Sequence, residues 1–209
     1  MNDVYDKFVS LGENCSISRV LNNLNYRNAS YPFDWNTTHF NFILDMFRHD
    51  FNVFLEPIDK LEKFGNIFRN SKKNIYFYHD GNYDNLKKNY EGIYEKYNRR
   101  ITNLKNLINS GEKILFIRKD SFIHNSYEYN LRKIDVLYNI IKRKYKKSNF
   151  NILFITNSEK YRNYKFTNPI IYLNMKVNSK YLYSNNKYIE EILSKLKIRK
   201  KFNSIPLKK

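Results

Sequence analysis

Hydrophobic runs alternate with amphipathic stretches along the chain, and this pattern predicts the order of strands and helices. Short hydrophobic runs predict strands at residues 4–10, 75–78, 113–118, 150–156 and 169–173. Hydrophobic residues that recur every three to four positions predict helices at residues 15–25, 84–110, 127–146 and 187–196. A further helix is expected after Asn36–Thr38, with an apolar side formed by Phe40, Ile43, Leu44 and Phe47. Residues 56–73 show no clean period.

The alternation of strands and helices is typical of a parallel sheet that is covered by helices on both faces. A chain of 209 residues suits one domain. We therefore expect a single α/β domain over residues 1–196, with a mainly parallel central sheet in a Rossmann-like three-layer arrangement. Residues 197–209 are expected to form a basic C-terminal tail.

The chain carries 38 Lys and Arg against 20 Asp and Glu, a net charge of +18. The functional interpretation of such an excess is an anionic partner, such as nucleic acid, an anionic membrane surface or an acidic substrate. The alternative is a solvated Lys-rich surface that reflects an AT-rich genome. The sequence has no zinc-finger spacing, ribonucleoprotein motif or Walker loop, so no motif selects nucleic acid.

The single cysteine excludes an internal disulfide, and the ligand pairs of a structural zinc site are missing. We expect neither a metal nor a cofactor. The N-terminus carries acidic residues where a secretory signal needs positive charge, and no apolar run approaches the ~18 residues of a membrane span. A cytoplasmic location with a free, reduced thiol is therefore expected.

Cys15 is the candidate nucleophile because of its place in the predicted fold. It follows a strand, a turn at Leu11-Gly12 and a capping residue, Asn14, and so opens the first helix. Unpaired N–H groups and the helix dipole stabilise negative charge at such a position, which lowers the pKa of a thiol placed there. Ligands of α/β sheets also bind at the carboxyl ends of the strands. The alternative is that Cys15 is a small buried hydrophobic residue.

A thiolate nucleophile needs a base, and His79 is the best candidate among four histidines. It follows the predicted strand at residues 75–78, which would place it at the same sheet edge as Cys15 if the strands are parallel. The other histidines are expected in a helical first turn, on the surface and in a polar loop: His39, His49 and His124.

Asp34 and Asp80 compete as the residue that orients His79. Asp34 lies in the aromatic loop Tyr31–Trp35, which can bring a carboxylate into a site of low dielectric constant; its alternative role is a turn cap. Asp80 is adjacent to His79, and adjacent side chains of an extended backbone point apart. Both candidates stay open.

Five segments of the chain form a recognisable set: residues 10–15 (SLGENC), residues 30–35 (SYPFDW), His79-Asp80, residues 97–101 (YNRRI) and residues 114–118 (ILFIR). Together they resemble the DUF1796 family of papain-like cysteine peptidases. The first two are fairly specific, whereas the last is a generic buried strand followed by an arginine. The resemblance covers roughly residues 5–155.

The resemblance implies a catalytic pair of Cys15 and His79, with Asp34 or Asp80 orienting the histidine. It also introduces a papain-like α+β fold as an alternative, in which a helix carries the cysteine and a later antiparallel sheet carries the histidine. The glutamine that supplies an oxyanion donor in papain-like enzymes has no equivalent in residues 4–14, so Asn14 or the N–H of Cys15 would serve. Further candidates for oxyanion or substrate binding are Gly12, Trp35 and Arg118.

The expected function is a cysteine peptidase (thiol protease), or a related thiol-dependent hydrolase or acyltransferase acting on a peptide or another acyl substrate. One alternative is a basic binding module for an anionic partner such as nucleic acid. A second is a phosphate- or sugar-processing α/β enzyme that uses Arg118 and Arg99-Arg100 in place of the thiol.

Overall fold

The main sheet is parallel, as the alternation of strands and helices predicts. The computed structural model describes residues 4–120, 127–156, 163–174 and 186–199. Within these ranges the main sheet has the strand order β2-β7-β8-β9, and every neighbouring pair is parallel. Its strands are β2 (Lys7–Ser10), β7 (Lys113–Lys119), β8 (Asn149–Thr156) and β9 (Ile170–Asn174). The predicted α/β class is thereby confirmed.

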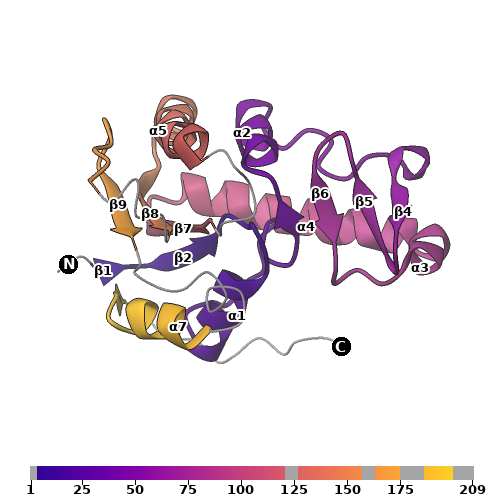
Figure 1. The fold of residues 1–209 in the computed structure, drawn as a ribbon, viewed down its shortest axis with the longest axis horizontal. Coiled ribbons are helices and arrows are strands. Elements are labelled where there is room, and N and C mark those ends of the chain that lie inside the picture. The colour runs from indigo at the N-terminus through magenta and orange to yellow at the C-terminus, as the bar shows by residue number, and fades with distance from the viewer. Residues whose placement is uncertain (1–3, 121–126, 157–162, 175–185, 200–209) are drawn as a thin grey trace.

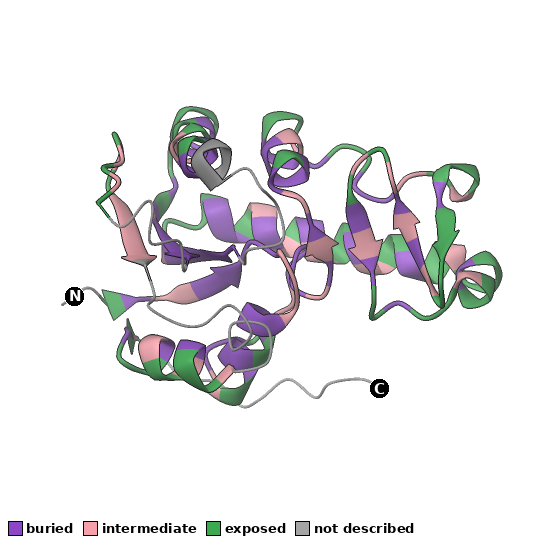
Figure 2. Ribbon diagram, in the orientation of Figure 1, coloured by how far each residue is buried: buried purple, intermediate pink, exposed green. Residues whose placement is uncertain are grey.

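The central strands serve two hydrophobic cores, because successive residues of a strand point to opposite faces of the sheet. On β7, Ile114 and Phe116 pack into one core, whereas Leu115 and Ile117 pack into the other. β8 repeats this alternation over residues 152–155. All of these side chains are fully buried, and β7 and β8 are largely purple in Figure 2. Burial on both faces explains why the two strands appear in the sequence as continuous hydrophobic runs.

Helices cover both faces of the parallel sheet (Figure 1). One core contains residues of α1 (Ser16–Asn23) and α7 (Asn186–Ser194), which pack against each other. The other core is larger and contains residues of α2 (Phe40–Arg48), α4 (Tyr90–Asn109) and α5 (Tyr127–Lys144). The three-layer arrangement is thus the one that the sequence predicts.

A second sheet, which the hydrophobic pattern does not predict, is antiparallel. Its strand order is β3-β6-β5-β4. The strands are β3 (Thr37–Thr38), β4 (Glu62–Phe64), β5 (Ile67–Asn70) and β6 (Ile75–Phe77), and a short 3-10 helix, η1 (Ile58–Lys60), precedes β4. β4 is exposed along its whole length, which is why this region shows no hydrophobic period. Phe68 and Phe77 stack at 4.7 Å between ring centroids and join the larger core.

The long helix expected over residues 84–110 is divided in two. α3 (Tyr83–Lys88) begins after Asn82, whose side chain accepts a hydrogen bond from the N–H of Asn85 at 2.8 Å. α4 begins at Tyr90, after Asn89, and packs into the larger core beside residues of both sheets. This helix therefore joins the antiparallel sheet to the parallel one (Figure 1).

Two short strands from the N-terminal and C-terminal regions form a separate two-stranded sheet. β10 (Lys197–Ile198), the first residues of the expected tail, pairs in parallel with β1 (Val4–Tyr5). Most of the expected basic tail lies outside the described residues. Among the helices that the structure describes, none is long and apolar enough to cross a membrane.

Candidate active site

The turn between β2 and α1 has an unusual backbone. Gly12 and Glu13 both adopt positive φ angles, of 73° and 77°. The N–H of Gly12 donates to Ser10 Oγ at 3.2 Å, and the N–H of Glu13 donates to Thr38 Oγ1 at 3.3 Å. A Cβ atom at Gly12 would lie 2.2 Å from Thr38 Oγ1, so this turn requires glycine for both conformation and space. Gly12 thus acts here by allowing the chain to turn sharply into α1.

Cys15 occupies the N-cap position of α1 and is partly exposed, whereas the sequence predicts Asn14 as the cap and Cys15 as the first helical residue. Asn14 supports this position, because its Oδ1 accepts a hydrogen bond from the N–H of Ser16 at 2.9 Å. Arg19 lies one turn further along α1, and its Nη2 is 3.6 Å from Cys15 Sγ. A guanidinium beside a sulfur stabilises the negative charge of a thiolate. Arg19 is not among the residues predicted from the sequence, although its i,i+4 spacing from Cys15 is a usable signal.

Lys119 adds a second positive charge near Cys15. It is the last residue of β7 and is fully buried, with its Nζ 3.9 Å from Glu13 Oε2. Burial lowers the pKa of Lys119, and the neighbouring Glu13 carboxylate and Cys15 sulfur oppose that shift. The carboxyl end of β7 and the first turn of α1 therefore each place one cationic group near the thiol.

His79 comes to the site from the antiparallel sheet. The sequence predicts His79 at the sheet edge of Cys15 if its strand is parallel to the others. That condition is not met, because β6 is antiparallel to both β3 and β5. Instead of sharing a sheet edge with Cys15, His79 packs its ring edge-on against Trp35, with 5.5 Å between centroids. The Arg27 guanidinium lies over the same indole, 5.5 Å from its centroid. Trp35 thus contacts both a cation and the candidate base.

Arg19 links Cys15 to His79 electrostatically. Burial of its ring lowers the pKa of His79 below its usual 6.5, and the positive charges of Arg19 and Arg100 lower it further. The carboxylate of Asp80 opposes them. A lowered pKa keeps the imidazole neutral near pH 7, the form that accepts a proton. Among the described residues no hydrogen bond joins Cys15 Sγ to His79, and the charge of Arg19 is what relates the two groups.

Asp80 is buried beside His79 and held by α4. The hydroxyl of Tyr97 lies 2.5 Å from Asp80 Oδ2, and Lys96 forms an ion pair with Oδ1. Asn36 Oδ1 lies 2.9 Å from the same hydroxyl. Asp80 therefore acts on His79 through its charge, which favours the protonated imidazole.

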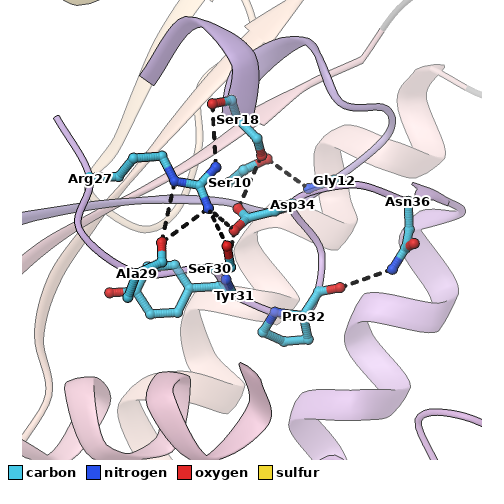
Figure 3. A network of polar contacts seen from close by, with 10 residues as sticks. All are labelled: Ser10, Gly12, Ser18, Arg27, Ala29, Ser30, Tyr31, Pro32, Asp34 and Asn36. Atoms are coloured by element: carbon cyan, nitrogen blue, oxygen red, sulfur yellow. Dashed lines mark hydrogen bonds and ion pairs between the residues drawn. The ribbon is translucent and has the colours of Figure 1, made fainter. Parts of the chain in front are cut away.

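Asp34 lies at the centre of a different network (Figure 3). It is buried and forms an ion pair with Arg27. It also accepts hydrogen bonds from Ser18 Oγ at 3.0 Å and from the N–H of Tyr31 at 2.6 Å. Arg27 in turn donates to the carbonyls of Ser18 and Ala29. In the described part of the chain Asp34 bonds to no histidine, and these contacts fasten the aromatic loop to α1.

Arg118 is also occupied by protein groups. It is buried, and it donates to Asp120 Oδ1 at 2.8 Å, to the carbonyl of Leu11 at 3.0 Å and to the carbonyl of Thr38 at 3.2 Å. These bonds join β7, the turn before α1 and β3. The guanidinium positions the backbone around Cys15.

The remaining histidines lie apart from this arrangement or outside the described residues. His39 is the N-cap residue of α2, near the helical first turn that the sequence predicts. His49 is exposed and pairs with Asp45 at 2.8 Å, in agreement with its predicted surface position. His124 lies outside the described residues.

Comparison with known proteins identifies the family. The sequence profile of DUF1796, described as "Putative papain-like cysteine peptidase", matches residues 6–160, which is most of the chain. The chain belongs to the DUF1796 family. The resemblance noted from the sequence is thereby confirmed. No curated protein and no solved structure matches the chain.

The DUF1796 description agrees with one feature of the geometry. The papain-like alternative expects a cysteine on a helix and a histidine from a later antiparallel sheet. In this DUF1796 protein Cys15 opens α1, and His79 follows β6 of the antiparallel sheet. The parallel sheet is an additional layer that supports the start of α1.

Replacement of Asp34 by alanine should destabilise the fold strongly. The change leaves the Arg27 guanidinium buried without its counter-ion, which costs about 3–5 kcal/mol. Urea denaturation followed by circular dichroism measures the effect. Glu191→Ala is the control, since it breaks an exposed pair with Lys195 and should leave the midpoint nearly unchanged. Equal stability of the two variants would contradict the structural role of Asp34.

Replacement of Gly12 by alanine should destabilise the protein by about 2 kcal/mol or more, because it combines an unfavourable left-handed backbone with a collision against Thr38. Gly65→Ala is the matched control: its φ is also positive, at 57°, but no atom lies within 4 Å of the added Cβ. We expect it to cost about 1 kcal/mol. A cost for Gly12→Ala no greater than that of the control, in the same denaturation assay, would disprove the close packing of this turn.

Proposed function

We propose that this DUF1796 protein is a thiol-dependent hydrolase or acyltransferase in which Cys15 is the nucleophile and His79 the acid–base group. The observation that carries the proposal is that Arg19 contacts Cys15 Sγ and that its positive charge also acts on His79. A helix-borne thiol, adjacent cations and a neutral imidazole are the components of a cysteine nucleophile. The family description favours a peptide as the first substrate class.

The proposed reaction proceeds in two steps. The sulfur attacks the carbonyl carbon and forms a C–S bond, while the carbonyl electrons move to the oxygen. Backbone N–H groups at the start of α1, including that of Cys15, would hold the resulting oxyanion. His79 takes the thiol proton and passes it to the leaving group as the C–N or C–O bond breaks. Water, or another nucleophile in a transferase, then attacks the acyl-enzyme and regenerates the thiol.

Asp80 would support His79 through its charge. The Tyr97 hydroxyl and Lys96 hold the carboxylate in place. An imidazolium that forms during the reaction is stabilised by the nearby carboxylate, as the effect of Asp80 on His79 indicates. Asp34 is less suited to this task, because its oxygens are engaged with Arg27, Ser18 and the backbone of Tyr31.

The alternative in which Arg118 holds a phosphate has less support. Its guanidinium already donates to Asp120, Leu11 and Thr38. A phosphate would have to displace these buried contacts.

Acylation of Cys15 tests the proposal directly. Incubation with p-nitrophenyl acetate should yield one acetyl group on Cys15, detected by intact-mass spectrometry, and Cys15→Ala should yield none. His79→Gln should slow acylation by about 100-fold or more, the usual contribution of a general base. His49→Gln is the matched control, because His49 is exposed and pairs with Asp45. If the His79 and His49 variants acylate at equal rates, Cys15 is only an accessible thiol.

The pH dependence follows from the pKa of His79. Since that pKa lies below 6.5, acidification should abolish acylation only when His79 becomes protonated, below pH 6.5. The C2 proton of His79, followed by NMR, should titrate with the same midpoint. Asp80→Asn should move that midpoint further down, because the carboxylate that favours the imidazolium is gone. A midpoint at or above 6.5, or an upward shift in the variant, would show that these charges do not act on His79 as described.

A further inference from the structure

Arg100 has an unsatisfied guanidinium close to the candidate base. Its Nη1 is buried and has no hydrogen-bond partner. Among the described residues the guanidinium forms no ion pair, and its recorded contact is with the ring of Tyr97, 5.3 Å from the centroid. An aromatic face attracts a cation but does not accept hydrogen bonds as an oxygen does. A buried donor without an acceptor is costly, so this arrangement is suited to a ligand that supplies one.

Protein carboxylates near Arg100 are already engaged. Arg100 lies over the ring of Tyr97, whose hydroxyl contacts Asp80. The second oxygen of Asp80 is paired with Lys96. Nη1 is buried, but Arg100 as a whole is partly exposed, so a group from solvent can reach part of this side chain.

The position of Arg100 relates it to the proposed reaction. Its charge acts on His79 together with that of Arg19, and Arg19 contacts Cys15 Sγ. A negative group bound at Arg100 would lie on the side of the site formed by Tyr97 and Asp80, the residue that follows His79 in the chain. A planar guanidinium with free N–H groups matches a carboxylate through two parallel hydrogen bonds.

We propose that Arg100 binds a carboxylate of the acyl substrate beside His79. That the bound molecule is a substrate rests on the proposed function, whereas binding of the carboxylate requires no reaction. Two sources supply this chemistry in a peptide, the C-terminal carboxylate and an acidic side chain. The first would make the enzyme act near the end of a chain, and the second would make it select acidic residues.

Binding can be measured without catalysis by NMR titration of the His79 C2 proton in the full chain. The probes are N-acetyl-alanine for a terminal carboxylate, N-acetyl-glutamate amide for a side-chain carboxylate, and N-acetyl-glutamine amide as the neutral control. A bound anion favours the imidazolium, so a carboxylate probe should raise the midpoint of His79 in a saturable manner. The neutral probe should leave it unchanged. The carboxylate probe that binds more tightly identifies the source.

Variants separate this site from general attraction to a basic protein. Arg100→Gln should weaken carboxylate binding by about tenfold or more, since a charge-assisted hydrogen bond is lost. Arg99→Gln removes the same charge from the adjacent exposed position and should leave binding unchanged. Arg100→Lys keeps the charge without the planar fork and should give an intermediate loss. It also provides a second measurement if Arg100→Gln folds poorly.

Two results would overturn the inference: no saturable shift of His79 with either carboxylate probe, or equal weakening in the Arg99 and Arg100 variants. The same titration in Cys15→Ala keeps this test separate from the proposed function. If the Cys15→Ala variant still binds the carboxylate and the wild-type protein is not acylated, the binding site is supported and the thiol chemistry is refuted. Acylation without carboxylate binding would do the reverse.

Discussion

The buried ion pair between Arg27 and Asp34 is the interaction on which the candidate site depends. Both side chains are almost completely removed from solvent, so each charge needs the other. The pair and its surrounding hydrogen bonds fasten the aromatic loop to α1, the helix that begins after Cys15. The loop in turn supplies Trp35, which supports the ring of His79. Asp34, a candidate catalytic carboxylate in the sequence, thus holds α1 and the aromatic loop in position next to the proposed reactive residues.

Two sheets of different kinds contribute the two proposed reactive residues. The parallel sheet ends in the turn that presents Cys15, whereas the antiparallel sheet carries His79. α4 contacts the core of both and provides Tyr97 and Arg100 on the histidine side. The relative position of thiol and imidazole is therefore set by a shared hydrophobic core rather than by a hydrogen bond between them.

The electrostatics of the site are dominated by positive charge. Arg19 and the buried Lys119 lie near the sulfur, and Arg19 and Arg100 act on the imidazole. Cations stabilise a thiolate and keep the imidazole neutral, so the same charges suit both proposed roles. They also suit an anionic group on the substrate. The net charge of +18 thus has at least one local counterpart in the structure, although most of the basic residues lie elsewhere in the chain.

The local pattern of hydrophobic and polar residues determines the main strands and helices of this protein. The buried strands β7 and β8, the helix that opens at Cys15 and the parallel sheet follow from hydrophobic periodicity and capping, which depend on near neighbours. The antiparallel sheet escaped prediction because its exposed strand β4 carries no alternation. Only the tertiary structure decided that Asp34 pairs with Arg27, that Arg118 bonds to backbone carbonyls, and that Nη1 of Arg100 is buried without a hydrogen-bond partner. Those outcomes depend on which charges are buried together, and residues distant in sequence meet only through packing.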